Sequence, residues 1–499
     1  MANHPPSFLW YDLETFGARP RQDRPAQFAA IRTDLDLNPI GDPINWLCQP
    51  TPELVPSPDA CLITGLTPQH CAAEGLPEPE FARRILSAMS QPRTCSAGYN
   101  SIRFDDEVCR FLFFRNLLPV YDREWRDGNS RWDILDVARL AYALRPEGIN
   151  WPSREDGAPS FRLETLSAAN GLQHDKAHDA LSDVEATIAL ARLIRTRQPK
   201  LFDWALQCRD KAFVKSQVPV LQQQPFVHVS GMLPASHGCL SVLVPLCFHP
   251  ANRNEIICFD LQSDPAELAG LSATDIRHRL FSPAETLGDT PRLGIKSIHA
   301  NKCPMVGPIS LFTDEVATRL GLDRARMEYH ATRLPDMKAL LPQLQEAMAR
   351  EAQPMDAEQA LYQGFISDRD QTACRQFHGT PASQWLQMEE PSDQRLQTVW
   401  RRFIARHYER ESGQPLPPER QADWQRYLRA ALTRPEVGCA LTLEQATARC
   451  RELRAEQPQN PVLDEVEAFL SQQQKMLYTT ERISADHDSG VPNDHNPRG

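Results

Sequence analysis

Two carboxylates near the start of the chain have a spacing that would let them share a metal ion. Asp12 and Glu14 lie two residues apart in FLWYDLETFG, at the end of an apolar run. Alternate side chains of a β-strand point to the same face, so this spacing brings both carboxylates together. Neighbouring acids raise each other's pKa, and a bound cation relieves their repulsion. For an isolated D-x-E, a solvated strand end is the alternative.

Two further motifs supply more acids and a histidine. In YNSIRFDDEV we expect a strand to end at Tyr99 and a helix to open near Asp105, where helix capping is the alternative role. In HDKAHDALSDVEATIALARLI, His178 and Asp183 are five apart, and Asp183 lies in the first turns of a helix with an apolar side. A histidine beside a helix start is commonly a cap or core residue, so neither motif is decisive alone.

The three motifs, in this order, resemble those of the DEDDh 3′→5′ exonucleases of the ribonuclease H-like superfamily. The resemblance narrows to the bacterial exodeoxyribonuclease I family through segments that run from Asp12 to about Pro304. These segments are DRPAQFAAIRTD, LITGLTPQ, GYNSIRFDDEV, NSRWDILD, ALRPEGINWP, SFRLETL, HVSGM, HPANRN and NKCP. The family's architecture implies an α/β fold, with a ribonuclease H-like mixed-sheet exonuclease domain, an SH3-like β-barrel domain and an α-helical C-terminal domain.

Hydropathy patterns predict the same three-part order. Short apolar runs with helical patterns between them fill the first part, β-rich runs begin at residue 226, and helical periodicity alone marks the last part. The predicted strands of the first part are 8–13, 26–32, 44–48 and 95–99, and a helix is expected from Trp132 to Leu144. The predicted divisions are 1–198 for the exonuclease domain, 199–352 for the barrel, 353–475 for the helical domain and 476–499 for a disordered tail.

The resemblance also implies a mechanism. Asp12, Glu14, Asp105 and Asp183 would hold two Mg²⁺ ions, with Mn²⁺ as a substitute, and His178 would orient or deprotonate the attacking water. Four carboxylates without a Cys or His cluster suit these hard ions and disfavour zinc. Two such ions stabilise the attacking and leaving oxygens of a displacement at phosphorus. The expected activity is release of nucleoside 5′-monophosphates from the 3′ end of single-stranded DNA, in DNA repair and recombination.

The resemblance places three more residues at the substrate. Arg162, in SFRLETL, would lie at the substrate end of the site, and a surface ion pair with Glu164 is the alternative. Thr15 and Phe16 would lie beside the terminal nucleotide, although Phe16 is equally suited to the core.

Basic and aromatic residues interleave after the second motif, a pattern typical of a groove that binds single strands. They are Arg110, Arg115, Tyr121, Arg123, Trp125, Arg126 and Arg131. The predicted DNA contacts are Arg110, Tyr121, Trp125, Arg139, Arg145, Asn301 and Lys302, with a core role for Trp125 left open. By resemblance, Arg145 and Trp204 would contribute to a pocket for the acidic C-terminal tail of single-strand DNA-binding protein.

Composition sets broader limits. The 499 residues carry a formal net charge of −11, which at first argues against an anionic partner. However, residues 192–216 contain seven basic residues and two acids, and residues 393–436 contain nine Arg and six acids, so these segments can line a groove with positive charge. The thirteen Cys include no C-x-x-C pair, which indicates buried free thiols. No apolar run spans a bilayer and no leader is evident, so we expect a cytoplasmic protein, and a monomer is the simplest assembly.

Two other functions fit parts of the pattern. A DEDDh exoribonuclease acting on short RNA or tRNA 3′ ends would need the same acids, because the sugar is read by shape and 2′-hydroxyl contacts. A catalytically inactive single-strand-binding module would need none of them. The complete set of acids argues against the module, and the exodeoxyribonuclease I-like segments argue for DNA.

Overall fold

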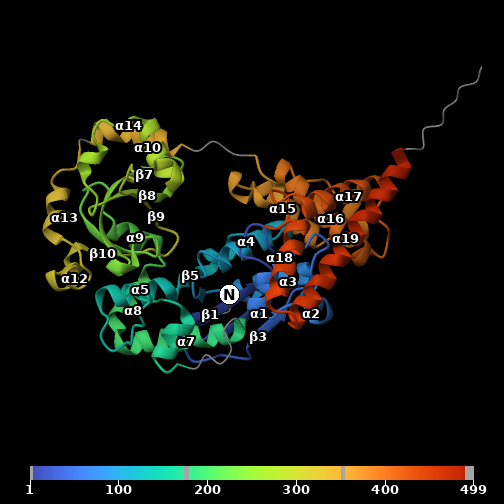
Figure 1. Cartoon of the computed structure of the whole chain (residues 1–499), viewed down its shortest axis with the longest axis horizontal. Coiled ribbons are helices and arrows are strands. Elements are labelled where there is room, and N and C mark those ends of the chain that lie inside the picture. The colour runs from blue at the N-terminus through green and yellow to red at the C-terminus, as the bar shows by residue number, and fades with distance from the viewer. Residues whose placement is uncertain (1–3, 173–178, 336, 350–353, 489–499) are drawn as a thin grey trace, which may run out of the picture.

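The computed structural model describes residues 4–172, 179–335, 337–349 and 354–488. Figure 1 shows three regions: the predicted exonuclease domain, which holds the N-terminus and is here called the exonuclease region, a β-rich region on one side of it and a helical region on the other. Both later regions rest on the exonuclease region, so all three can contribute to one site.

A five-stranded mixed sheet forms the centre of the exonuclease region. Its strands are β1 (Ser7–Thr15), β2 (Pro25–Thr33), β3 (Ile44–Leu47), β4 (Thr94–Gly98) and β5 (Ser130–Asp133), in the order β3-β2-β1-β4-β5. β2 and β3 run antiparallel to their neighbours, whereas β4 and β5 run parallel to β1. The predicted mixed α/β sheet is confirmed. The helix predicted from Trp132 is wrong at its start: Trp132 lies in β5, and Asp133 caps the helix that follows.

Helices cover both faces of this sheet. They are α1 (Pro58–Thr64), α2 (Pro68–Glu74), α3 (Glu78–Met89), α4 (Asp105–Arg115), α5 (Ile134–Leu144), α6 (Leu163–Ala169), α7 (Ala180–Arg197) and α8 (Pro199–Gln207). Phe8 and Trp10 of β1 belong to the core cluster that includes α5, α7 and α8, while Leu9, Tyr11 and Leu13 belong to the cluster that includes α3 and α4. Because side chains alternate between the two faces along β1, these residues also determine on which face each later side chain of the strand lies. α8 packs on α5 and α7, although the predicted boundary groups it with the barrel.

An antiparallel sheet organises the β-rich region. Its strands are β6 (Phe226–Val229), β7 (Leu240–His249), β8 (Asn252–Asp260), β9 (Ile295–His299) and β10 (Met305–Pro308), in the order β10-β6-β7-β8-β9. Its helices are α9 (Lys211–Gln217), α10 (Ala273–Phe281), α11 (Ala284–Leu287), α12 (Asp314–Arg319), α13 (Arg324–Ala331) and α14 (Met337–Met348). The first of these strands begins at Phe226, where the β-rich runs of the sequence begin.

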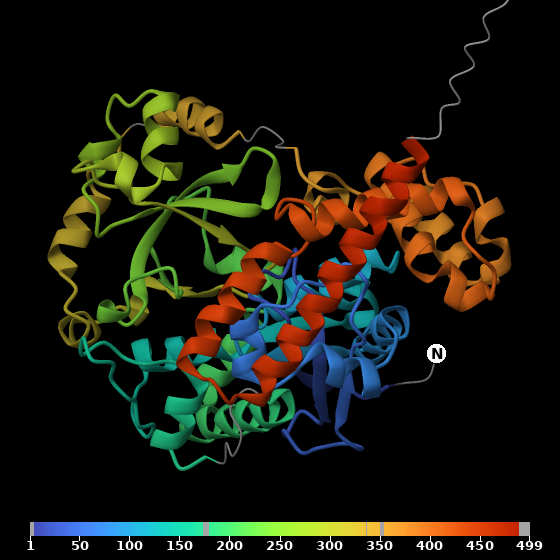
Figure 2. The same cartoon turned by 45° about the vertical axis from the view of Figure 1, so that its right-hand side comes forward.

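The last region is helical, as its periodicity predicts. Its helices are α15 (Asp368–His378), α16 (Gln394–Ser412), α17 (Pro418–Thr433), α18 (Leu443–Glu456) and α19 (Pro461–Asp488). The apolar side of α16 joins the core cluster of α3 and α4, and α18 and α19 lie on α1 and α2 (Figure 2). α19 runs to Asp488, beyond the predicted start of a tail at 476, because the sequence has no Gly or Pro between residue 476 and Gly490.

All thirteen cysteines are buried and free, which confirms their interpretation as structural thiols. Within the described ranges, none of the helices combines the length and apolar character that a membrane span requires.

Candidate active site

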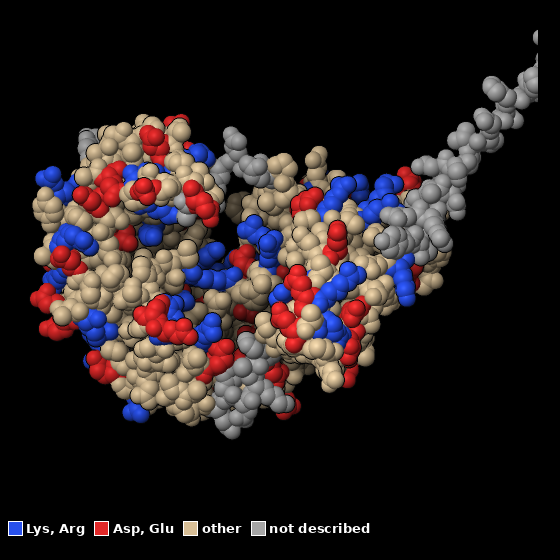
Figure 3. Space-filling view, viewed as in Figure 1, with Lys and Arg blue, Asp and Glu red and all other residues tan. Residues whose placement is uncertain are grey.

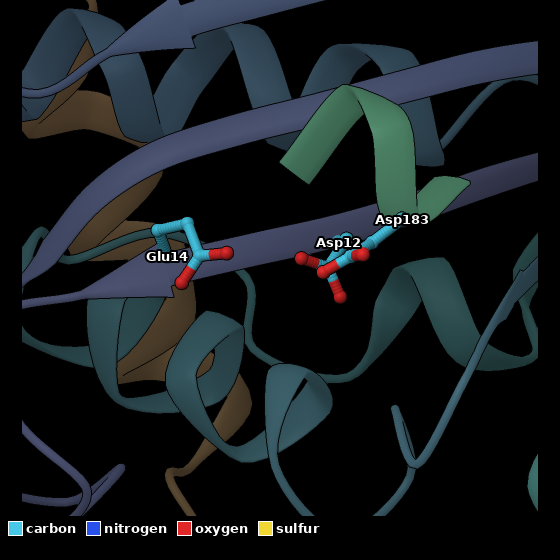
Figure 4. Close-up of side chains that lie close together, drawn as sticks. All are labelled: Asp12, Glu14 and Asp183. Atoms are coloured by element: carbon cyan, nitrogen blue, oxygen red, sulfur yellow. The ribbon is translucent and has the colours of Figure 1, made fainter. Parts of the chain in front are cut away.

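The acids of the first motif meet an acid of the third. Asp12 and Glu14 lie on the same face of β1 as Phe8 and Trp10, and this face packs against α7. Asp183 lies in the first turns of α7. One carboxylate oxygen from each of Asp12, Glu14 and Asp183 lies within 4.8 Å of the others. Figure 4 shows Asp12 and Asp183 against each other, with the carboxylate of Glu14 pointing toward them. The strand period and the start of α7 thus bring together residues far apart in the sequence.

Asp105 is placed where the sheet opens. β1 pairs with β4 only as far as Trp10 and Ala97, so the backbone beyond this point is free to bind a side chain. The N–H of Leu13 donates to Asp105 Oδ1 at 2.9 Å. Asp105 is 3% exposed, and burial, followed by the charge of Asp12, raises its pKa well above the ordinary value. The structure therefore places Asp105 near Asp12, beside the group of three.

The loop before Asp105 is fixed by one buried carboxylate. Asp133 accepts hydrogen bonds from the N–H groups of Asn100 (2.9 Å), Ile102 (3.1 Å) and Leu135 (3.0 Å). Asn100 turns the chain with a φ of 62°, a conformation that asparagine adopts more readily than most residues. Asp133 thus links the end of β5 to the loop that carries Asp105.

The acids of the cluster favour protonation in the absence of a cation. Burial, and then Asp183, raise the pKa of Asp12 to about 8. Burial, and then Asp12, Asp183 and Asp179, raise the pKa of Glu14 to about 9. No Lys or Arg lowers the pKa of either Asp12 or Glu14. Crowded carboxylates with raised pKa values fit a divalent cation, which Asp12, Glu14 and Asp183 would hold with hard oxygen ligands.

Protein without divalent ions is expected to lose stability as the pH rises. The folded pKa values of Asp12 and Glu14, about 8 and about 9, exceed the unfolded values of about 4. Their protonation therefore stabilises the folded state. This contribution to the free energy of unfolding is fully present below the unfolded pKa values and is lost as the pH rises through about 8 and 9. Thermal denaturation in chelator at pH 5, 7 and 9 measures this. Added Mg²⁺ should raise the melting temperature most at pH 9, and a pH-independent melting temperature in chelator would contradict the assignment.

Asp106 has a different environment from its neighbour Asp105. Its carboxylate accepts hydrogen bonds from Tyr11 Oη at 2.7 Å, Arg123 Nη2 at 2.5 Å and Arg131 Nη1 at 2.6 Å. Burial alone would raise the pKa of Asp106, but Arg123 and Arg131 hold it well below the ordinary value. Asp106 is thus a permanently charged structural residue.

The other residues predicted at the site are a histidine and three residues predicted to bind the substrate, and these three differ in their exposure. His178 lies outside the described residues. Thr15 is buried and donates to the carbonyl of Gly17 at 2.5 Å. Phe16 is 1% exposed in the core cluster shared with α18 and α19, so it takes the core alternative and offers no surface to a nucleotide. Arg162 is exposed, immediately before α6.

Sequence reasoning missed Asp179. It precedes the first residue of α7 and contributes to the raised pKa of Glu14. Gln27 Nε2, from β2, donates to its Oδ1 at 3.3 Å. Its place directly after His178 was the one indication available in the sequence.

A cavity of about 1370 Å³, here called the interdomain cavity, is lined by all three regions. Five predicted DNA contacts line it: Arg110, Tyr121, Trp125, Asn301 and Lys302. Ile102 and Arg103, in the loop before Asp105, line it too. Figure 3 shows Lys and Arg side chains gathered where the β-rich and helical regions face each other. The acidic protein therefore has a basic concave surface connected by one loop to the acid cluster.

Several arginines predicted in the basic and aromatic stretch are structural. Arg110 pairs with Glu124 at 2.8 Å and with Glu107 at 2.7 Å, so its charge is already compensated. Arg115 is buried in an ion pair with Glu78, and Arg123 and Arg131 bind Asp106 as described above. Buried arginine is stable only with such partners, and sequence alone does not reveal them. Trp125, by contrast, is 63% exposed, so its core alternative is wrong.

Three predicted contacts lie outside the lining of the interdomain cavity. Arg139 pairs with Asp136 at 2.6 Å, and its guanidinium packs so closely on Gly231 that a Cβ there would lie 2.6 Å from it. Arg145 is exposed at the end of α5, and its Nη1 donates to the carbonyl of Leu144. Trp204 is half-buried and donates through Nε1 to the carbonyl of Val306 at 2.9 Å. Arg139 and Trp204 thus join the exonuclease region to the β-rich region.

Comparison with known proteins assigns all three regions. Residues 9–191 match the exonuclease family, 209–350 the exonuclease I SH3-like domain and 355–473 the exonuclease I C-terminal domain. Exodeoxyribonuclease I of Escherichia coli is 47% identical over 378 residues, which cover 74% of this chain and 78% of the relative.

Solved structures agree over nearly the whole chain. A moderately thermophilic exonuclease I from Methylocaldum szegediense has a TM-score of 0.88 at 44% identity, covering 95% of this chain and 99% of the other. A zinc-bound form of the E. coli exonuclease I complex with single-stranded DNA has a TM-score of 0.87 at 38% identity, covering 95% and 100%. With three family-specific domains matched in order, the chain belongs to the exodeoxyribonuclease I family.

Proposed function

We propose that this protein is a single-strand-specific 3′→5′ exodeoxyribonuclease that releases nucleoside 5′-monophosphates and acts in DNA repair and recombination. The observation that carries the proposal is the cluster of Asp12, Glu14 and Asp183, with ligand oxygens within 4.8 Å of one another, in a chain of the exodeoxyribonuclease I family. The basic interdomain cavity supplies the surface that a strand requires.

The acids of the cluster would hold the cations, which would supply the chemistry at phosphorus. Asp12, Glu14 and Asp183 would hold the divalent ions, with Asp105 in support. When bound, such ions polarise the scissile phosphate and stabilise the oxygens that enter and leave phosphorus. His178 would accept the proton of the attacking water, for which its ordinary pKa of about 6.5 is suited. Arg162 would bind the terminal phosphate, since its exposed guanidinium can pair with two phosphate oxygens.

We propose Mg²⁺ as the working ion, with Mn²⁺ as a substitute. A carboxylate-only donor set favours both, but the E. coli relative has been solved with zinc, so occupancy and activity need separate measurement. Activity in matched concentrations of Mg²⁺, Mn²⁺ and Zn²⁺ makes the distinction. Zn²⁺ supporting the fastest turnover would overturn the proposal of Mg²⁺.

Selectivity for single strands would come from the interdomain cavity. Stacking on exposed aromatic faces is available only to unpaired bases, and Tyr121 and Trp125 line the cavity together with Lys302. Asn301 and Lys302 would contribute from the β-rich region. The protein would hold the strand through phosphate contacts and stacked bases, without reading sequence.

A partner-binding role completes the proposal. Arg145 is exposed at the end of α5 and would bind the acidic C-terminal tail of single-strand DNA-binding protein. Trp204, in the interface of the first two regions, would contribute to the same pocket. The protein would be cytoplasmic. It would act as a monomer, because one chain supplies every wall of the cavity. Titration of a tail peptide into wild-type protein and Arg145→Ala tests the binding of the tail. Sedimentation measures the mass of the protein in solution and tests the monomer.

Matched substrates test the proposed activity. End-labelled single-stranded DNA, duplex DNA and RNA of one sequence are incubated with Mg²⁺ or with chelator. Rapid degradation of single-stranded DNA alone, lost in chelator, is the expected result. RNA degraded as fast as DNA would favour the exoribonuclease, and binding without any mononucleotide product would favour the inactive module.

A further inference from the structure

A tyrosine joins two loops that the proposed function places at the active site. Tyr99 directly follows β4 and precedes the loop that carries Asp105. Its Oη donates to the carbonyl of Phe161 at 2.5 Å, and Phe161 is the residue before Arg162. We propose that Tyr99 is a positioning residue whose hydroxyl holds Arg162 at the substrate end of the acid cluster, an inference that rests on the proposed function.

The carbonyl of Phe161 takes its hydrogen bond from outside its own segment. The N–H of Leu166 donates to the carbonyl of Arg162 at 2.9 Å, and this bond starts the helical hydrogen bonds of α6. The carbonyl of Phe161 lies one residue before that start. A carbonyl removed from water needs a donor, and Tyr99 supplies one from a position 62 residues earlier in the chain.

The ring of Phe161 is held as well as its carbonyl. It packs edge-on against Tyr142 and Trp151, with ring centroids 5.6 Å and 6.2 Å away. The guanidinium of Arg139 lies over the same ring, 5.9 Å from its centroid. These contacts fix the backbone that enters Arg162, while the side chain of Arg162 itself stays exposed and free to meet a phosphate.

The loop that leads to α6 is closed on itself. The N–H of Ser160 donates to the carbonyl of Pro152 at 2.7 Å, a bond that lies within the loop and does not attach it to the sheet. Tyr99 makes such an attachment at the end of β4. The backbone beside Tyr99 is fixed in turn, because the N–H of Asn100 donates to Asp133 Oδ1 at 2.9 Å. One hydroxyl thus relates the phosphate-binding end of the site to the loop that carries one of its acids.

The hydroxyl of Tyr99 can be removed without removing the packing of its ring. The ring lies against the core cluster that includes α5, α7 and α8, and phenylalanine would keep this contact. Burial raises the pKa of Tyr99 well above the ordinary value, so the hydroxyl remains a donor at the pH of any assay. A tyrosine needed only for packing would tolerate Tyr99→Phe without a kinetic effect, whereas a positioning residue would not.

The test compares Tyr99→Phe, Arg162→Ala and the double variant. Hydrolysis of an oligothymidylate with Mg²⁺ is followed in single turnovers, and binding of the same strand is measured in chelator. Tyr99→Phe should lower the single-turnover rate roughly 10- to 100-fold, as expected for a displaced binding group, while the strand affinity stays within a few-fold of wild type. In the Arg162→Ala protein the same substitution should change the rate little, because two changes that act on one contact are not additive.

Tyr408→Phe is the matched control. Tyr408 is 2% exposed on α16, in the helical region, and its Oη donates to Gln414 Oε1 at 2.9 Å. Its loss of one hydroxyl should leave the rate at the wild-type value. A wild-type rate in Tyr99→Phe, or an equal loss with and without the Arg162 side chain, would overturn the inference, as would an unchanged rate in Arg162→Ala. Failure of the wild-type protein to degrade single-stranded DNA would instead overturn the proposed function, so the two failures are distinguishable.

Discussion

Asp12→Asn is expected to lower the rate of strand hydrolysis by at least roughly a thousandfold, because cation stabilisation of the transition state supplies several kcal/mol. The substitution removes the carboxylate that lies beside both Glu14 and Asp183 in the cluster. It leaves the interdomain cavity intact, so the affinity for single-stranded DNA should remain within a few-fold of wild type. Single-turnover hydrolysis and binding in chelator measure the two effects separately.

Stability should respond in the opposite direction from activity. Asp12→Asn removes a half-buried charge whose own pKa is raised to about 8, so the melting temperature in chelator at pH 9 should be at or above that of wild type. The rise in melting temperature on adding Mg²⁺ should largely disappear. Asp42→Asn, at an exposed residue, is the control and should change neither property. Retained turnover in Asp12→Asn would remove Asp12 from the cation site.

Asp106→Asn should destabilise the protein by about 3–5 kcal/mol, the usual effect of removing one partner from a buried charge network. Arg123 and Arg131 would both lose the shorter of their ion pairs and keep only the pairs with Glu124. Arg131 also donates to the carbonyl of Asn301 at 2.8 Å, so the attachment of the β-rich region should weaken as well. Urea denaturation measures the change in the free energy of unfolding.

Asp105→Asn is the matched comparison, since it changes the same side chain one residue earlier. Burial and Asp12 raise the pKa of Asp105, so loss of its charge should cost little stability, while hydrolysis should fall sharply. The two neighbours should therefore separate activity from stability. If Asp105→Asn lost stability and Asp106→Asn lost only activity, the assignment of the two acids would be reversed.

Local periodicity was sufficient to predict the strand that carries the first two acids. The alternation of β1 places Phe8, Trp10, Asp12 and Glu14 on one face, and the structure has that arrangement. The proximity of Asp183 came from the family resemblance, because no local pattern relates α7 to β1. The mixed sheet, the β-rich second region and the helical third region were also predictable in order. Helix ends were less so, as the extension of α19 to Asp488 illustrates.

Partners between distant segments could not be predicted. Arg402 and Arg406 belong to the second basic run, yet Arg402 pairs with Asp356, and Arg406 pairs with Glu53 and Glu358 in the interior. A charge count over a segment treats such buried arginines as if they faced solvent. Phe365 presents the converse difficulty, because its side chain is fully exposed although nothing in the local sequence distinguishes it from a core phenylalanine. Both properties depend on tertiary packing.

The most direct test of the account follows the order in which two labels leave one DNA strand. A single strand with a 3′-terminal label and a different 5′ label is digested in Mg²⁺, and the products are resolved over time. We predict that the 3′ label appears as a nucleoside 5′-monophosphate in the first turnover, that the 5′ label stays on the shortening strand, and that chelator or Asp12→Asn stops both changes. Early release of the 5′ label, internal fragments, or undiminished digestion in chelator would contradict a cation-dependent 3′→5′ exonuclease.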